Sequence, residues 1–305
     1  MNTNQNELAL VVMAAGAARR YGGLKQLAPA GPRGEAVMEY SIHDALAAGF
    51  SQVVLVIRRE FEPLFREKFV DRASSTAPIT FVYQDIENSV PHRWRGIRRD
   101  KPWGTAHAVL CAGQKIDRAF AVINADDYYG PTALAQMAQY LATISPDRPL
   151  PAAMVGYELR HTLSTSGTVS RGVCEHDANG LLLRIVERHG IANRGDGGEF
   201  SDAQGKAQFL PGDTTVSMNL WGYPREMFDH LEQRFTNFLD GPREESQEFE
   251  LPTTTQRLID ERLMTVRVLK TNERWCGMTY QEDLPIVQQR LASLVNSGVY
   301  PSQLW

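Results

Sequence analysis

The sequence predicts an α/β fold, with a mostly parallel central sheet flanked by helices. Short apolar runs rich in β-branched residues alternate with longer segments whose apolar residues recur at helical spacing. At the start of the chain the order is strand, helix, strand, helix, strand, which is the order of a parallel α/β sheet. The 305 residues are 43% hydrophobic and 22% charged, a composition typical of a folded protein with a large core.

The predicted elements of the first half have clear boundaries. The first apolar run, 8–13, is long enough for a buried strand and too short for a membrane span. Gly49 ends the first helix, and Pro131 suits the first turn of the last one. The predicted strands are 8–13, 53–57, 79–83 and 119–123, and the predicted helices are 37–48, 60–69 and 131–143.

The second half begins after a cluster of prolines at positions 146, 149 and 151. It contains a β-hairpin around the turn 177–180, and the polar, Gly-rich segment 190–213 is predicted to be a long loop. No linker separates the halves, so we expect one domain, 1–305, with halves 1–150 and 151–305. The predicted strands are 152–159, 168–174, 181–186, 214–223 and 265–269, and the predicted helices are 224–239 and a segment that follows 248–252 and ends at 263.

The composition argues against several classes of function. A net charge of −4 gives no support for nucleic-acid binding, and the basic stretch 91–103 is better explained as a solvated loop that supplies at most one or two cations to a phosphate site. Residues 1–7 are polar and do not begin a signal peptide or a membrane span. We expect a cytoplasmic protein with no membrane or nucleic-acid partner, and a homo-oligomer is compatible with the sequence. The three cysteines lack CxxC spacing and suit free thiols: Cys111, Cys174 and Cys276.

A turn of small residues follows the first strand. Ala14, Ala15 and Gly16 carry no bulky side chain, so backbone N–H groups of this turn can approach an anion closely. Two cations follow, Arg20 and Lys25. The pattern indicates a phosphate-binding loop that is neither a P-loop nor GxGxxG. The alternative is a tight strand-to-helix turn with solvated basic residues.

Two carboxylates, Asp126 and Asp127, follow the predicted strand 119–123. Hard oxygen ligands next to a phosphate site suit Mg²⁺, which keeps phosphate oxygens as partners. The alternative is an Asx turn that caps the next helix, and this explanation suits Asp127 well.

The loop resembles the signature of the sugar-phosphate nucleotidyltransferases, roughly Ala-Ala-Gly-x-Gly-x-Arg-x-Gly followed by Lys. Ala18 stands where that family usually has Gly. The resemblance implies that the loop wraps a nucleoside triphosphate, and that Arg20 and Lys25 neutralise the triphosphate and the leaving pyrophosphate. The matching positions are Ala14, Ala15, Gly16, Arg20, Gly22 and Lys25.

Two further segments resemble nucleotide-binding parts of this family. Gly104, Thr105 and His107 lie in a Gly-Thr-Ala-x-Ala segment, which implies a helix that begins beside the nucleobase. Gly104 allows a close approach to the base and Thr105 suits a helix cap, whereas His107 faces either the base or solvent. Asp126 matches the family's metal-binding Asp, which implies Mg²⁺ as the cofactor.

The acceptor side of the resemblance lies in the second half. Glu187 and Arg188 resemble a Glu-Lys pair that binds the sugar and its 1-phosphate, with Arg in place of Lys and His189 in place of Pro. The alternative is an exposed, salt-bridged strand end. Asn219 matches an Asn placed near the acceptor, with a hydrogen bond at a strand edge as a close alternative. Glu248 is a weaker candidate for the wall of the site.

The segment 275–283 resembles the family's closing motif, in which many relatives carry a second metal-binding Asp. Here Gly277 and Thr279 stand in that turn. Thr279 and Glu282 have the spacing of a capping box, and a position near a helix N-terminus explains Asp283 without a metal. We therefore do not expect Asp283 to bind the metal directly, and the sequence leaves the second metal ligand open.

Together the resemblance implies a nucleotidyltransferase that uses an NTP and a sugar 1-phosphate, or a similar phosphorylated acceptor, and releases pyrophosphate. The first alternative is a glycosyltransferase of the related α/β (GT-A) type, which has no use for a triphosphate loop. The second is a non-catalytic relative that senses a nucleotide, which the missing second carboxylate favours.

Overall fold

The computed structural model describes residues 7–16, 24–73, 78–97, 99, 101–242, 244, 246–278 and 280–305. Its centre is strand β1 (Leu8–Met13), which is apolar throughout and is covered on both faces. Alternate residues of β1 enter two different cores, Leu10 and Val12 one, Ala9 and Val11 the other. A strand buried in this way belongs in the interior of a parallel sheet.

The parallel part of the sheet is built around β1. It pairs in parallel with β2 (Phe50–Ile57) on one side and with β4 (Phe120–Asn124) on the other, and β3 (Ile79–Tyr83) extends the sheet beyond β2. The predicted parallel sheet of the first half is thereby confirmed.

The second half adds mainly antiparallel strands to the same 11-stranded sheet. Strand β11 (Thr215–Tyr223) pairs antiparallel with β4, β6 (Leu150–Glu158) and β7 (Val169–His176). Strand β12 (Met264–Lys270) then pairs in parallel with β6. The α/β class is as predicted, with the parallel strands concentrated in the first half.

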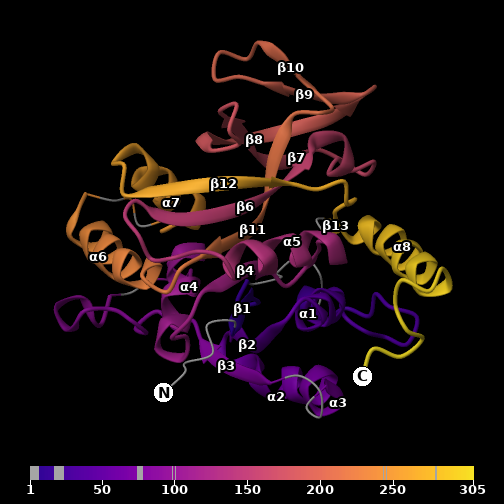
Figure 1. Cartoon of the computed structure of the whole chain (residues 1–305), viewed down its shortest axis with the longest axis horizontal. Coiled ribbons are helices and arrows are strands. Elements are labelled where there is room, and N and C mark those ends of the chain that lie inside the picture. The colour runs from indigo at the N-terminus through magenta and orange to yellow at the C-terminus, as the bar shows by residue number, and fades with distance from the viewer. Residues whose placement is uncertain are drawn as a thin grey trace.

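An antiparallel arm replaces the loop predicted for 190–213, and that prediction is wrong. Strands β8 (Leu182–Arg194), β9 (Gly197–Ser201) and β10 (Ala207–Pro211) extend from β7 and project from the top of Figure 1. Much of this arm meets solvent on both faces, as the largely exposed β10 illustrates. The sequence therefore lacks the alternation of apolar and polar residues that marks a half-buried strand.

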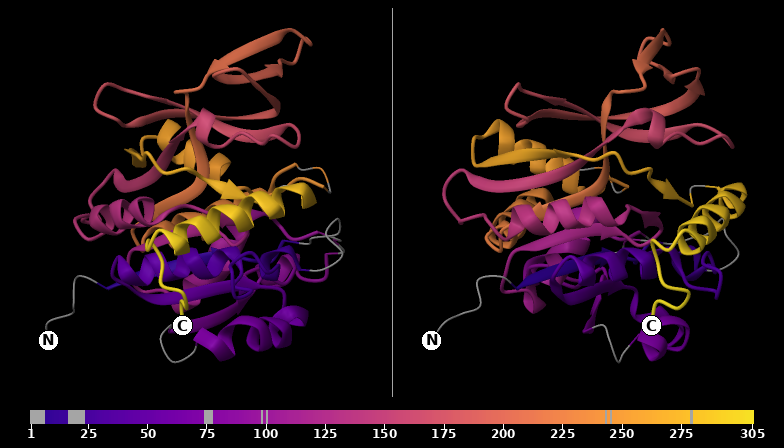
Figure 2. Two further views of the ribbon diagram at one scale, coloured as in Figure 1. Left: turned by 90° about the vertical axis from the view of Figure 1, so that its right-hand side faces the viewer. Right: turned by 45° about the vertical axis from the view of Figure 1, so that its right-hand side comes forward.

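Helices cover both faces of the sheet (Figures 1 and 2). One face is covered by α1 (Val37–Ala47), α2 (Glu62–Phe65), α3 (Asp71–Ala73) and α5 (Pro131–Leu141), whose apolar residues share a core with Leu10 and Val12. The opposite face carries α4 (Thr105–Ala112), α6 (Met227–Asp240) and α7 (Leu251–Asp260). Helix α2 is joined to α3 by a π-helical turn, 66–70, within the helix predicted over 60–69.

A smaller, third core joins the last helix, α8 (Leu284–Asn296), to α1. Next to it, the short strands β5 (Asp127–Tyr128) and β13 (Cys276–Gly277) pair antiparallel, which attaches the segment before α8 to the end of β4. No helix in the described part of the chain is long and apolar enough to cross a membrane.

The buried hydroxyl of Tyr129 ties these elements together. It accepts a hydrogen bond from the Asn124 N–H at 3.0 Å and donates one to the Met218 carbonyl at 2.9 Å. The first partner ends β4, and the second lies where the pairing of β11 with β6 shifts register. One side chain thus satisfies backbone groups on two neighbouring strands.

We expect Tyr129→Phe to lower the free energy of unfolding by about 2–4 kcal/mol, since each buried polar group left unpaired costs roughly 1–3 kcal/mol. Urea denaturation measures the change. The control is Tyr140→Phe, which loses one bond to the Ala152 carbonyl at a half-buried position and should cost about 1 kcal/mol. Equal losses for the two variants would contradict a special role of Tyr129.

Candidate active site

The register between β1 and β4 brings two candidate segments together. Met13 lies opposite Asn124, and the Met13 carbonyl accepts a hydrogen bond from the Ala125 N–H at 3.1 Å. The small-residue turn that begins at Ala14 therefore leaves the sheet beside Asp126. These are the carboxyl ends of parallel strands, where open α/β sheets bind ligands.

Lys25 and Asp126 meet at this edge. The Lys25 Nζ donates to Asp126 Oδ2 at 2.6 Å, across 101 positions of sequence. Their side chains are 19% and 30% exposed, so the pair is accessible to a ligand yet shielded from bulk water. The structure brings together two of the three residues predicted to act on the triphosphate. The third, Arg20, lies outside the described residues.

The ends of the small-residue turn are anchored. The Ala14 N–H donates to the Val56 carbonyl at 2.8 Å, so this amide belongs to the sheet. The carbonyl of Ala15 accepts from Arg58 Nε, and the carbonyl of Gly16 accepts from the buried Gln26 side chain at 2.9 Å. Of these three residues, Gly16 is exposed and the two alanines are buried.

Asp127 is a buried carboxylate beside the ion pair. Its Oδ2 accepts a hydrogen bond from Asn124 Nδ2 at 2.8 Å and lies 3.3 Å from the Tyr129 hydroxyl. Burial, together with the neighbouring charge of Asp126, raises the pKa of Asp127 to about 7. Asp127 lies in β5 and is held by Asn124, which precedes it in the chain.

Gly277 lies opposite Asp127 in the β5–β13 pair. A Cβ atom at this position would lie 2.5 Å from Asp127 Oδ1 and 2.4 Å from the Trp275 ring. Asp127 and Trp275 therefore fill the space that a side chain at 277 would need. A second carboxylate at 277 is incompatible with this packing.

Asp283 serves the start of α8. Its carboxylate accepts hydrogen bonds from the Tyr280 N–H at 2.7 Å and from the Ser164 hydroxyl at 3.2 Å. The reciprocal cap thus involves Tyr280 and Asp283, one residue later than the predicted pair of Thr279 and Glu282, and Thr279 lies outside the described residues. These bonds agree with a capping role for Asp283.

Gly104 and Thr105 fix α4 to the start of α7. Gly104 has φ +113°, and a Cβ there would lie 2.6 Å from the Phe249 carbonyl oxygen, so its close approach is to protein backbone. The Thr105 hydroxyl accepts the Leu251 N–H at 2.9 Å, so the predicted cap of its own helix is wrong. Gln84, which sequence reasoning missed, donates to the Gly104 carbonyl at 2.8 Å.

His107 lies in the protein core, in neither of the two environments predicted for it. The ring is fully buried, its Nε2 is 2.7 Å from the Asn88 carbonyl, and its centroid is 4.8 Å from that of Phe235. Burial lowers the pKa of His107 to about 4. Its ring supports the packing beneath α4 and does not line the site.

Glu187 and Arg188 project to opposite faces of β8, because neighbouring residues of a strand alternate. The Arg188 guanidinium lies 5.2 Å from the Phe200 ring centroid, so the structure does not bring the two side chains together. Asn219 has φ +62° at the register shift of β11, and its amide oxygen accepts from Trp221 Nε1 at 3.3 Å. Such left-handed positions suit Asn among non-glycine residues.

Arg171 is a buried cation that sequence reasoning missed. Arg171 lies on β7, directly opposite Arg188 of β8. Its guanidinium lies 4.7 Å from the Trp275 ring centroid. Burial lowers the pKa of Arg171 to about 10, although the carboxylates of Asp127, Glu187 and Asp283 favour its charged form. The local sequence Val169–His176, with Ser170 before the arginine and Glu175 after it, gave no signal of this burial.

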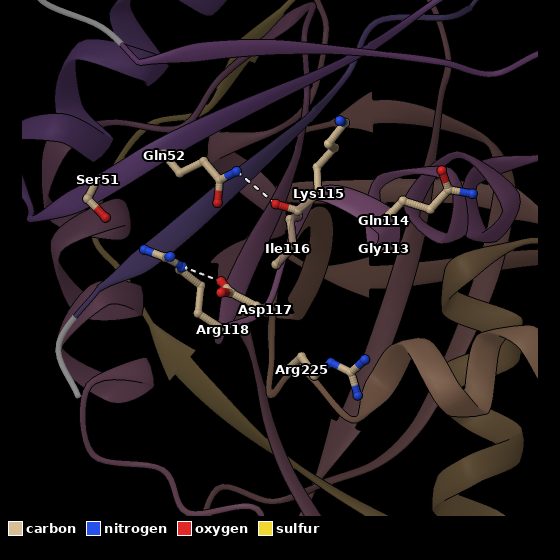
Figure 3. A pocket seen from close by; sticks show the side chains of 9 residues that line it. All are labelled: Ser51, Gln52, Gly113, Gln114, Lys115, Ile116, Asp117, Arg118 and Arg225. Carbon is tan, nitrogen blue, oxygen red and sulfur yellow. Dashed lines mark hydrogen bonds and ion pairs between the residues drawn. The ribbon is translucent and has the colours of Figure 1, made fainter. Parts of the chain in front are cut away.

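A large hollow lies at the opposite edge of the sheet and is not part of this site. Its volume is about 560 Å³. Figure 3 shows Ser51, Lys115 and Arg225 among the residues that line it. Ser51 lies near the start of β2, whereas the Lys25–Asp126 pair lies at the carboxyl edge.

The carboxylate at this edge suits a Mg²⁺ ion that is held partly by water and phosphate oxygens, and not an ion enclosed by protein ligands alone. Within the described part of the chain, no group of three or more His, Cys, Asp or Glu side chains is placed to hold a metal ion. Asp126 offers a partly exposed carboxylate, and Mg²⁺ is commonly held by one or two carboxylates together with water and phosphate oxygens.

We expect Gly277→Ala to lower the free energy of unfolding by about 1–3 kcal/mol, since the added methyl overpacks against Asp127 and Trp275. Chemical denaturation measures the loss. Gly241→Ala is the control, because its Cβ would meet only the Asn237 carbonyl at 3.2 Å; its change should stay within about 0.5 kcal/mol. A neutral Gly277→Ala would show that Asp127 has room to move.

The low pKa of His107 predicts a loss of stability in acid. Between pH about 6.5 and about 4 the unfolded chain binds a proton at His107 that the folded protein excludes, so falling pH favours unfolding. The contribution reaches up to about 3 kcal/mol near pH 4. Denaturation at several pH values should give a shallower decline for His107→Gln than for the unchanged protein; parallel pH profiles would refute the assignment.

Comparison with known proteins assigns part of the chain to a family. Residues 10–161 match the family model of the MobA-like NTP transferase domain. No curated protein matches the sequence.

Solved structures share the whole fold at low identity. The inositol-1-phosphate CTP transferase from T. maritima is 15% identical, with a TM-score of 0.60, over 94% of this chain and 96% of that one. A putative glucose-1-phosphate thymidylyltransferase from Bacillus anthracis is 10% identical, with a TM-score of 0.61, over 93% and 95%. Through residues 10–161 the chain belongs to the MobA-like NTP transferase domain family, and its fold is that of sugar-phosphate nucleotidyltransferases.

Proposed function

We propose that this protein transfers a nucleoside monophosphate from an NTP to a sugar 1-phosphate, or a similar phosphorylated acceptor, with release of pyrophosphate. The observation that carries the proposal is the contact between Lys25 Nζ and Asp126 Oδ2 at the carboxyl edge of the sheet. A cation and a carboxylate from distant segments converge there, beside a turn of small residues.

The reaction needs alignment and charge neutralisation more than proton transfer. A phosphate oxygen of the acceptor forms a bond to the α-phosphorus, and the bond from the α-phosphorus to the bridging oxygen breaks, so the electron pair leaves with pyrophosphate. The acceptor oxygen is already anionic, so no general base is required. Lys25 is then a positioned cation for the triphosphate and the departing pyrophosphate.

Asp126 would hold Mg²⁺ when the nucleotide is bound. The ion would supply positive charge to the phosphate oxygens. In the nucleotide-free protein, Lys25 and Asp126 neutralise each other. A triphosphate competes for Lys25 and releases the Asp126 carboxylate, so binding of nucleotide and of metal should support each other. Arg20 is the second predicted triphosphate cation.

The acceptor would lie beyond Asp126, toward β7 and β11. Glu187 and Asn219 are candidates to bind its hydroxyl groups, and Arg171 and Arg188 are cations on the other face of the β7–β8 pair. The fold neighbours named above carry inositol 1-phosphate and glucose 1-phosphate in their names, which supports a phosphorylated polyol or sugar as the acceptor class.

A nucleotide-sensing protein without turnover is the second candidate, and Gly277 favours it. The packing of Asp127 against Gly277 leaves no second carboxylate at that turn. Such a protein would bind NTP and form no pyrophosphate with any acceptor. A glycosyltransferase is less well supported, because Lys25 and the small-residue turn would then have no triphosphate to bind.

The test is a screen for pyrophosphate release, with the common NTPs against sugar 1-phosphates, inositol 1-phosphate and phosphocholine, with and without Mg²⁺. With the NTP and acceptor that give pyrophosphate in this screen, we expect Lys25→Met and Asp126→Asn each to lower kcat by about a hundredfold or more. This loss corresponds to roughly 2.7–4 kcal/mol of transition-state stabilisation.

Lys115→Met is the matched control, since this exposed lysine lines the hollow of Figure 3, away from the site. It should retain normal turnover. Near-normal activity of either site variant would refute its assigned role, and NTP binding without pyrophosphate release would favour the sensing protein.

A further inference from the structure

A second cavity, of about 390 Å³, lies on the α8 side of the candidate site. Its walls are the segment 160–165 and helix α8, and its floor is the segment 274–277, which includes β13. This volume lies within the roughly 300–1,000 Å³ typical of pockets for small molecules. Asp283 is the one acidic residue among those that line it, and the basic residues are Arg160, His161, Arg171, Arg274 and Arg290.

Two of these arginines already have ion-pair or hydrogen-bond partners. Arg160 forms ion pairs with Asp196 at 2.7 Å and with Glu158 at 3.2 Å. Arg171 donates to the Thr162 side chain and carbonyl and to the Ser170 carbonyl. Arg274 and Arg290 are the remaining two arginines of the lining.

Arg274 and Arg290 have no carboxylate partner among the described residues. Both line the cavity. Burial raises the pKa of the Cys276 thiol to about 12, and the positive charges of Arg290 and Arg274 oppose that rise, whereas the charge of Asp127 adds to it. Arg274 comes from the segment before β13 and Arg290 comes from α8. Asp283 is occupied by the Tyr280 N–H and the Ser164 hydroxyl.

Two residues of the cavity lining also carry buried N–H groups that lack an acceptor. Trp275 is 9% exposed, and its Nε1 has no hydrogen-bond partner in the described structure. The Nε of Arg290 is likewise buried and without a partner. An N–H buried without an acceptor costs roughly 1–3 kcal/mol, so a side-chain shift that brings either N–H to an acceptor in the cavity would be favourable.

We propose that this cavity is an anion-binding site, built by Arg274, Arg290 and the Trp275 indole, for the phosphate or carboxylate group of a small molecule. Oxygen anions supply the acceptors and the negative charge that the cavity lacks, and arginine binds them in paired hydrogen bonds. The site is separate from the Lys25–Asp126 pair. Anion binding there can be tested without nucleotidyl transfer, and only the choice between the two sources of the anion rests on the proposed function.

The site is connected to the candidate active site. Gly277 in its floor pairs with Asp127, and Arg171 in its wall lies within electrostatic range of Asp127. The same anionic group can come from two molecules. It is either the distal end of the phosphorylated acceptor, or part of a separate anionic metabolite that changes turnover from this position.

The test is calorimetric titration of the full chain with inorganic phosphate at constant ionic strength. A Lys25→Met background removes the triphosphate cation from the measurement. We expect binding that weakens at least tenfold in Arg290→Gln and in Arg274→Gln. Arg225→Gln is the matched control, because this exposed arginine lines the distant hollow of Figure 3; its affinity should be unchanged.

A second readout locates the anion. The indole N–H signal of Trp275, assigned by Trp275→Phe, should shift in the NMR spectrum on titration with phosphate, and should not shift in Arg290→Gln. Absence of phosphate binding, or equal binding in the unchanged and Arg290→Gln proteins, would overturn the proposal even if pyrophosphate release is observed.

Turnover distinguishes the two sources, and either result supports the site. If the anion belongs to the acceptor, Arg290→Gln should raise the acceptor KM about tenfold at unchanged kcat. If it belongs to a separate metabolite, phosphate should alter kcat of the unchanged protein, and Arg290→Gln should abolish that effect at an unchanged acceptor KM.

Discussion

The pairing of β1 with β4 is the constraint on which the candidate site depends. Since Met13 lies opposite Asn124, the two strands end at the same level, and the residues that follow them face a common space. A shift of one residue would exchange the side chains that enter the two cores, because Leu10 and Val12 face one core and Ala9 and Val11 the other. The hydrophobic pattern of β1 therefore also fixes where the turn that begins at Ala14 lies relative to Asp126.

Close packing around Asp127 gives the site a rigid wall. Its carboxylate is held by Asn124, lies beside the Tyr129 hydroxyl and is covered by Gly277. Buried polar networks of this kind are stable when every group is satisfied and costly when one is removed. The glycine at 277 and the carboxylate at 127 are thus two parts of one arrangement, in which the neighbouring strand leaves space for the acid.

The sequence was informative where local patterns decide structure. The strand 79–83 agrees with β3, and a carboxylate directly after a buried strand indicated Asp126. It was uninformative where long-range packing decides. The burial of His107 depends on Phe235 from α6, and the role of Gly104 depends on the Phe249 backbone. Likewise, Arg171 gained its place beside Trp275 through contacts between segments about a hundred positions apart.

The projecting arm has a consequence for how the molecule tolerates change. Strand β10 has no buried side chain, and Phe209 is 58% exposed, whereas Phe200 of β9 belongs to the core that contains Leu10 and Val12. Free energy of folding comes chiefly from apolar burial, so insertions, deletions or altered residues in β10 and in the turn 202–206 should disturb the two main cores little. The outer end of the arm can accordingly diverge in length and chemistry while the edge that carries Lys25 and Asp126 stays the same.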